Sequence, residues 1–244
     1  MMKPIQKNKL VVCIQAFFIV TILLVTGCST DTPSQNQEPV QNLSPKQVLD
    51  DLIAGNKRFL SNSPLHRNDL QIKGAEAAKL GQSPKIVILA CMDSRSIPEI
   101  VFDQSVGDIF TLRVAGNIVN KAMVGSIEYA TKYAGAKLIV VLGHTKCGAV
   151  EAACQGIRDG NLSAIIDVIE PAVQDVSSQS EKNCDDNAFV TKLARQNVYN
   201  MMQLILKESP VVADMIARKE LAIVGGMHDL RSGVVNFDFI DQSL

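Results

Sequence analysis

The sequence predicts an α/β fold, a mostly parallel central β-sheet flanked by helices, with an N-terminal helical arm. Residues 85–90 (KIVILA) and 137–142 (KLIVVL) are short and almost wholly apolar, which is typical of strands buried on both faces of a parallel sheet. Segments with helical spacing of apolar residues lie between the strands, and this alternation is the pattern of α/β domains. The chain of 244 residues is long enough for one such domain with its own core.

The charge balance limits the partners that the protein can have. The chain carries 24 Lys+Arg and 25 Asp+Glu, a formal net charge of −1. A dedicated nucleic-acid-binding protein needs a basic surface against the phosphate backbone, so this composition argues against a nucleic-acid partner.

Residues 1–27 have the pattern of an export signal. Three lysines precede an apolar run over residues 10–25, which is shorter than the roughly 20 residues of a membrane span and suits a secretory signal. Gly27-Cys28 at its end resembles the lipobox of bacterial lipoproteins, in which the chain is cut before a cysteine that receives lipid. This resemblance implies that Cys28 anchors an exported protein in the cell envelope, on the periplasmic side of the outer membrane if the source is Gram-negative. An uncleaved anchor, or a plain signal with an incidental cysteine, remains an alternative.

A tether and a folded domain follow the signal. Residues 28–43 are rich in Ser, Thr, Gln, Asn and Pro and are predicted to form a flexible tether. The domain, residues 44–244, begins with a helix, because Ser44, Pro45 and Gln47 fit the N-cap, the first helical position and the third position of a capping box.

The remaining elements follow in order along the domain. The predicted strands are residues 85–90, 109–114, 137–142, 221–224 and 234–240, the last at an edge of the sheet. The predicted helices are residues 123–133, 149–157, 162–176 and 189–207, and Ser209-Pro210 starts another. The polar residues 175–187 are predicted to form a loop.

Two thiols and one imidazole are predicted to meet at one edge of the sheet. Cys91 directly follows the strand 85–90, and His144 and Cys147 directly follow the strand 137–142. Ligand sites of open α/β sheets form at the carboxyl ends of their strands. These residues are the ligand set of a Cys₂His zinc site, so we expect one Zn²⁺ per subunit.

The fourth zinc position decides whether the site is structural or catalytic. A structural zinc normally has four protein ligands, and the further candidates are Cys154, Cys184 and Asp93. Cys154 lies about 10 Å along a helix from Cys147, which leaves a position for water and predicts catalysis. Cys154 is either a buried thiol or the disulfide partner of Cys184, since export permits disulfides. Asp93 is either the fourth ligand or the partner of Arg95 in a bidentate ion pair that keeps it ionised.

These motifs carry a resemblance to a known family. Cys91-x-Asp93-x-Arg95 with His144-x-x-Cys147 resembles the β-class carbonic anhydrases, and further similar segments are residues 81–84, 107–110, 113–117 and 127–130. The resemblance implies that Cys91, His144 and Cys147 bind zinc and that Asp93 and Arg95 form a dyad that orients the zinc-bound hydroxide. It also implies a substrate pocket completed across a dimer interface, in a homodimer or homotetramer. The implied pocket residues are Gln82, Phe110, Ala115, Tyr129 and Gly148.

The predicted function is reversible hydration of CO₂ to bicarbonate by a zinc-bound hydroxide. Two thiolates cancel the charge of zinc, so activity is expected to rise with pH into the mildly alkaline range. The absence of Trp and the presence of Gln82 favour members whose aspartate stays off the zinc. His228 is a better candidate for a proton shuttle than His66, although a packed histidine is the simpler interpretation.

Two other functions remain open. The same site is suited to hydrolysis of a CO₂ analogue, CS₂ or COS, and a lipoprotein that binds zinc or bicarbonate without catalysis is also possible. A zinc deaminase is disfavoured, because the His-x-Glu and Pro-Cys-x-x-Cys motifs of that class are absent from the sequence.

Overall fold

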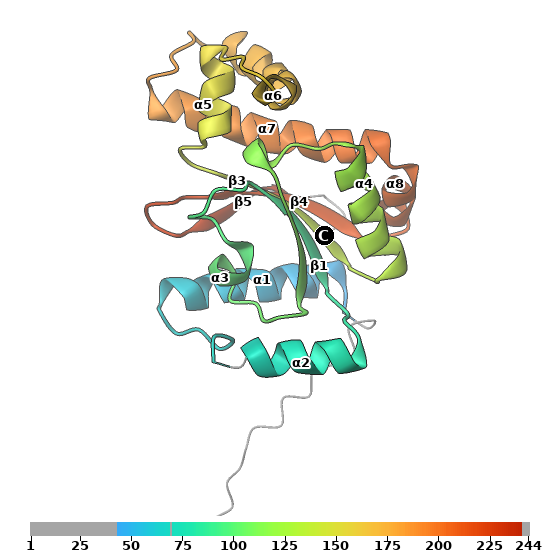
Figure 1. Ribbon diagram of the computed structural model, residues 1–244. Coiled ribbons are helices and arrows are strands. Elements are labelled where there is room, and N and C mark those ends of the chain that lie inside the picture. Colours follow the sequence, from blue (N-terminus) through green and yellow to red (C-terminus); the bar gives the residue numbers. More distant parts are fainter. Residues whose placement is uncertain (1–42, 69, 241–244) are drawn as a thin grey trace, which may run out of the picture. The chain divides into compact units, whose positions relative to one another are not determined.

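The structure, a computed structural model, describes residues 43–68 and 70–240 (Figure 1). The predicted signal, Cys28 and nearly all of the tether lie outside the described residues. Within them lies a five-stranded sheet in the order β2-β1-β3-β4-β5. The strands are β1 (Ile86–Ala90), β2 (Ile109–Arg113), β3 (Leu138–His144), β4 (Ala222–His228) and β5 (Val235–Ile240). The first four are parallel, and β5 pairs antiparallel with β4, which confirms the predicted fold class and the edge position of the last strand.

The apolar strands supply both cores of the domain. Every residue of β1, β3 and β4 is buried. Along β1, Val87 and Leu89 enter one core and Ile86 and Ile88 enter the other, because successive side chains of a strand point to opposite faces. The two-sided burial explains the continuous apolar runs of the sequence.

One face of the sheet is covered by α4 (Lys121–Glu128), α5 (Gly148–Gln155), α6 (Leu162–Ser177), α7 (Asn187–Glu208) and α8 (Pro210–Ala217). Figure 1 shows α7 running along the sheet, with α5 and α6 beyond it. The close approach of α7 depends on glycine in the strands beneath it. A Cβ atom at Gly143 would lie 2.6 Å from Val198 Cγ2, and one at Gly225 would lie 2.7 Å from Val198 Cγ1.

The other face carries α1 (Pro45–Leu60), with α2 (Leu70–Leu80) and α3 (Pro98–Val101) near it (Figure 1). The capping box of α1 is present, since Gln47 N donates to Ser44 Oγ and Ser44 N donates to Gln47 Oε1. The predicted start of the helical arm is therefore confirmed. The sequence did not predict α2 or α3, and α2 buries none of its 11 residues against the rest of the described chain.

Several boundaries differ from the sequence prediction. Helix α6 continues through Ser177, so residues 175–177 are helical and not part of the predicted loop. The predicted helix 123–133 begins at Lys121, and its last turn, Tyr129–Tyr133, is π-helical. Strand β4 continues beyond residue 224 through a register shift at Gly225/Gly226.

A disulfide joins Cys154 on α5 to Cys184 in the loop before α7. The simpler interpretation of Cys154 as a buried free thiol is therefore wrong, and the disulfide alternative is confirmed. Among the helices of the described residues, none combines the length and the apolar character that a membrane crossing requires.

Candidate metal centre

The two thiols and the imidazole meet at the carboxyl ends of β1 and β3. Cys91 follows β1, His144 ends β3, and Cys147 is the N-cap of α5. The ends coincide because β1 and β3 pair in parallel register, Ala90 opposite Leu142. The ligand atoms of the three residues lie within 4.8 Å of one another, and all three residues are buried. The group has the size and the donor set of a metal site.

The orientation of His144 leaves one ring nitrogen free. Its Nδ1 lies 2.9 Å from the Thr145 carbonyl oxygen, to which an Nδ1–H donates. The Nε2 atom is buried and has no hydrogen-bond partner within the described part of the chain. A backbone carbonyl on the second nitrogen is the usual way in which a metal-binding histidine is oriented, so this orphaned atom fits a metal ligand.

The thiols of Cys91 and Cys147 differ in pKa. A hydrogen bond from Cys147 lowers the pKa of Cys91 to about 4, against the effect of burial, and the sulfur atoms are 4.0 Å apart. The pKa of Cys147 is raised, because its thiol donates a hydrogen bond to the Cys91 sulfur, is buried, and on ionisation would place a second thiolate beside the first. A divalent cation removes this repulsion and lets both sulfurs act as thiolate ligands.

Asp93 forms the predicted bidentate pair with Arg95. Asp93 Oδ1 accepts from the Arg95 backbone N and from Nε, both at 2.9 Å, and Oδ2 accepts from Nη2 at 2.7 Å. These bonds hold the pKa of Asp93 well below its usual range. The same Oδ2 lies 3.9 Å from His144 Nε2, so an ionised carboxylate borders the ligand group.

Arg113 supports this loop, a role that the sequence pattern did not predict. Its Nε donates to the Cys91 carbonyl at 3.0 Å, and its Nη2 donates to the Asp93 carbonyl at 2.6 Å. The sequence signal for this role is an arginine at the end of the otherwise uncharged strand IFTLR. Arg113 fixes the backbone on both sides of Met92.

The predicted pocket residues divide into two groups. Ala115, in a 3₁₀ turn after β2, and Gly148, the first residue of α5, lie at the same end of the sheet as Cys91. Phe110 pairs with Val87 near the start of β1 and packs edge-on against Tyr129, with ring centroids 6.5 Å apart. The four residue steps from Val87 to Cys91 span about 13 Å of strand. The exposed Gln82 precedes β1, so one chain does not bring these three residues to its own ligand group.

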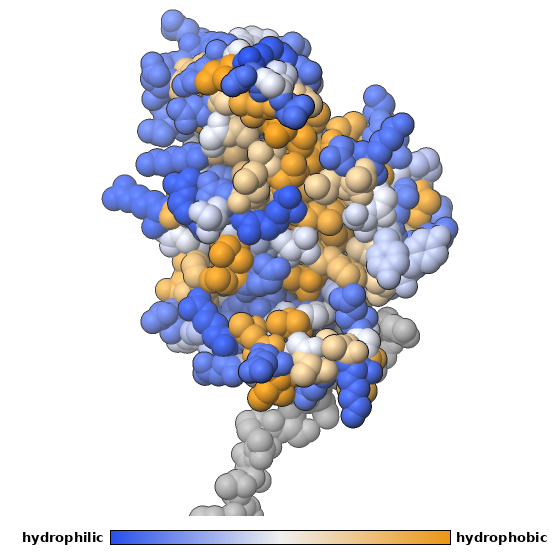
Figure 2. Space-filling model, in the orientation of Figure 1, coloured by the Kyte–Doolittle hydropathy of each residue, from blue (hydrophilic) through white to orange (hydrophobic). Residues whose placement is uncertain are grey.

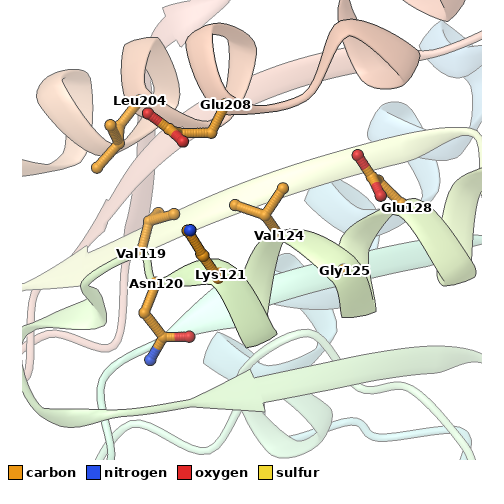
Figure 3. Close-up of a pocket in the computed structure, with 8 residues that line it drawn as sticks. All are labelled: Val119, Asn120, Lys121, Val124, Gly125, Glu128, Leu204 and Glu208. Carbon is orange, nitrogen blue, oxygen red and sulfur yellow. The ribbon is translucent and has the colours of Figure 1, made fainter.

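A separate cavity of about 440 Å³ lies between α4 and α7 (Figure 3). Figure 3 shows Glu128 and Glu208 at its rim, with Val124 and Leu204 pointing into the space between the helices. None of the metal-ligand candidates lines it.

Comparisons with known proteins identify the family that the chain matches. A family model described as carbonic anhydrase matches residues 86–235. Carbonic anhydrase 2 of Mycobacterium tuberculosis (strain H37Rv) is 36% identical over 194 residues, which cover 79% of this chain and 92% of that protein. A carbonic anhydrase of Mycolicibacterium smegmatis is 33% identical over 196 residues, covering 80% and 93%.

Solved structures share the fold. A structure described with two tetrameric β-carbonic anhydrases from Sordaria macrospora gives a TM-score of 0.62 at 24% identity, covering 79% of this chain and 94% of that one. A β-carbonic anhydrase of Aspergillus fumigatus gives a TM-score of 0.59 at 25% identity, covering 80% and 91%.

Proposed function

Because this chain belongs to the carbonic anhydrase family, we propose that it catalyses the reversible hydration of CO₂ to bicarbonate at the centre formed by Cys91, His144 and Cys147. The observation that carries the proposal is the convergence of these three buried donors beside the ionised Asp93–Arg95 pair. A site that only stored a metal has no need of a carboxylate held charged at its border.

The donor set fits one Zn²⁺ per subunit. Cys91 and Cys147 would bind it as thiolates, and His144 would bind it through the free Nε2. Zinc so held supplies a nucleophile near neutral pH, because it lowers the pKa of a coordinated water.

The chain's own residues orient the reaction. Arg95 keeps Asp93 ionised, and the carboxylate can then accept a hydrogen bond from the attacking hydroxide and direct its lone pair at the carbon of CO₂. Arg113 holds the peptide that carries Asp93, so the acceptor stays in place. The proton released when water becomes hydroxide leaves to solvent.

We also propose that the active protein is a homodimer or homotetramer whose substrate pocket is completed by a second copy. Among the described residues, β2 has a strand partner on one side only, and Ile72 and Leu80 of α2 are 63% and 81% exposed. Figure 2 shows apolar side chains over α2 and across the face above it. Gln82, Phe110 and Tyr129 lie toward the end of the sheet opposite their own Cys91, where a neighbouring subunit's centre can use them.

Export and lipid anchoring through Cys28 remain part of the proposal. The Cys154–Cys184 disulfide supports an oxidising compartment. Mass spectrometry of the mature N-terminus tests the anchor: we expect a lipidated Cys28, and a Cys28→Ser variant should move from the membrane to the soluble fraction. An unmodified N-terminus at Met1 would contradict cleavage and lipidation.

Stopped-flow CO₂ hydration, run beside a zinc measurement on the purified protein, tests the activity. We expect one zinc per chain and CO₂ hydration that disappears in Cys91→Ser. COS and CS₂ are assayed on the same preparation, and turnover of either without CO₂ hydration would replace the proposed reaction by its analogue.

A further inference from the structure

We propose that Ser96 and His228 are positioning residues that hold Asp93 in place beside the ligand group, an inference that rests on the proposed function. Ser96 Oγ and His228 Nδ1 lie 2.9 Å apart and share a hydrogen bond. The two residues are 132 positions apart in the chain, and their exposed fractions are 1% and 3%.

The hydrogen bond fastens the turn that carries Asp93. The Ser96 backbone N donates to the Asp93 carbonyl at 3.1 Å, so Asp93, Arg95 and Ser96 belong to one tight turn between β1 and α3. Arg113 holds this turn from β2, and His228 holds it from the end of β4. The turn is thereby fastened on two sides.

The ion pair alone does not fix the turn. The side chain of Arg95 is 58% exposed, and it belongs to the same turn as Asp93. Arg95 keeps the Asp93 carboxylate ionised and fixes its rotation, but Arg95 moves together with the turn. The Ser96–His228 hydrogen bond connects the turn to β4. Both residues are buried, and a buried polar group without a hydrogen-bond partner destabilises the fold.

His228 also contacts the segment of the metal ligand. It pairs with His144 across β3 and β4, and its carbonyl accepts from the Thr145 backbone N at 3.0 Å. The Thr145 carbonyl is the acceptor of His144 Nδ1. One residue therefore connects the Asp93 turn with the carbonyl that orients the imidazole. Its burial and its occupied Nδ1 favour this role over the predicted proton shuttle.

The test combines kinetics with hydrogen exchange of the full chain, with and without zinc. In Ser96→Ala and His228→Leu, the backbone N–H groups of Arg95 and Ser96, which both bond to Asp93, should exchange about tenfold faster. The protection of β1 and β3 should stay unchanged. The kcat for CO₂ hydration should fall about tenfold at unchanged zinc content.

Three further variants make the test specific. His228→Asn, whose amide can reach Ser96 from nearly the position of Nδ1, should recover most of both losses, whereas His66→Asn should change neither. The double variant Ser96→Ala/His228→Leu should lose little more than the worse single one, because both remove the same bond.

Unchanged exchange at Arg95 and Ser96 would overturn the inference, and so would faster exchange with full kcat. A wild-type protein without CO₂ hydration would instead overturn the proposed function, and the exchange data would still show whether the turn is held as inferred.

Discussion

At the scale of single residues, the centre depends on two orientations that other residues impose. The Thr145 carbonyl turns His144 so that Nε2 faces the thiols, and Arg95 turns Asp93 so that both carboxylate oxygens are engaged. Neither orienting group is itself a ligand candidate. The orientations of His144 and Asp93 therefore depend on residues that contact them and that would not bind the metal themselves.

Asp93→Asn should lower the rate of CO₂ hydration by about a hundredfold or more while zinc content stays at one per chain. An amide has a single acceptor oxygen, and its NH₂ would face an Arg95 N–H, so the side chain must turn away. Stopped-flow kinetics and a zinc assay measure the two effects.

Asp238→Asn is the matched control, since Asp238 also pairs with an arginine, Arg195, but lies on β5. This control should keep the full rate. An Asp93→Asn protein that hydrates CO₂ at the wild-type rate would show that the carboxylate does not orient the nucleophile.

At the scale of elements, Asp103 attaches the helical arm to the domain. It accepts from Arg58 Nε of α1 at 2.5 Å and from the Leu65 backbone N at 3.0 Å, and its side chain is 1% exposed. Burial raises its pKa, but the hydrogen bonds from Arg58 and the backbone prevail and lower it. Its φ of 46° is a conformation that Asn also adopts readily.

Asp103→Asn should therefore lower the free energy of unfolding by about 3 kcal/mol at pH 7. A lowered native pKa stabilises the fold above the unfolded value of about 3.9, so the difference from wild type should persist at pH 5. It should shrink as the pH falls below 4 through the native pKa. Urea unfolding of metal-free protein at pH 7, 5 and 3 measures this trend.

Asp50→Asn, which breaks an exposed pair with Lys46 on the same helix, should cost less than about 1 kcal/mol at every pH. A difference for Asp103→Asn that stays constant down to pH 3 would contradict the assigned sign.

The disulfide acts at the same scale, because it fastens the far end of the helix that begins at Cys147. Replacing Cys154 and Cys184 by Ser should lower the free energy of unfolding by about 3 to 4 kcal/mol, the chain-entropy value for a sequence separation of 30. Thermal or urea unfolding with and without reductant measures it. Reductant should lower the free energy of unfolding of the wild type and leave that of the double variant unchanged. Equal losses in both proteins would show that the Cys154–Cys184 disulfide is not the source of the reductant's effect.

The three ligand candidates could be predicted to converge because they directly follow strands, and strand ends are local patterns of the sequence. The bonds that hold the neighbouring Asp93 turn could not be predicted, since Ser96, for example, bonds to His228, 132 positions away, and no spacing encodes such a pairing. Helix α2 could not be predicted, because none of its residues is buried against the described part of the chain and it lacks the apolar stripe by which a helix is recognised.

At the scale of the whole molecule, the proposed sharing of pocket residues makes the subunits interdependent. Cys91→Ser lacks a metal ligand, and Gln82→Ala/Tyr129→Ala lacks the aromatic and amide groups at the other end of the sheet. Each protein alone should be nearly inactive. In a mixed dimer, the intact Cys91 of one chain meets the intact Gln82 and Tyr129 of the other.

Unfolding the two variants together and refolding the mixture should restore about a quarter of the wild-type activity, because half of randomly assembled dimers are mixed and each has one intact site. Stopped-flow assays of the mixture and of the separately refolded variants measure this recovery. Activity equal to the mean of the separate variants would show that each chain completes its own pocket.

The described cysteines form two pairs. Cys154 and Cys184 are joined by a disulfide, whereas Cys91 and Cys147 are free thiols with their sulfur atoms 4.0 Å apart. An oxidant that closes the first pair can also reach the second unless a cation already occupies it. Maturation therefore has a preferred order, cation first and oxidation second. Protein oxidised under chelation should lose two further free thiols and no longer take up zinc until it is reduced.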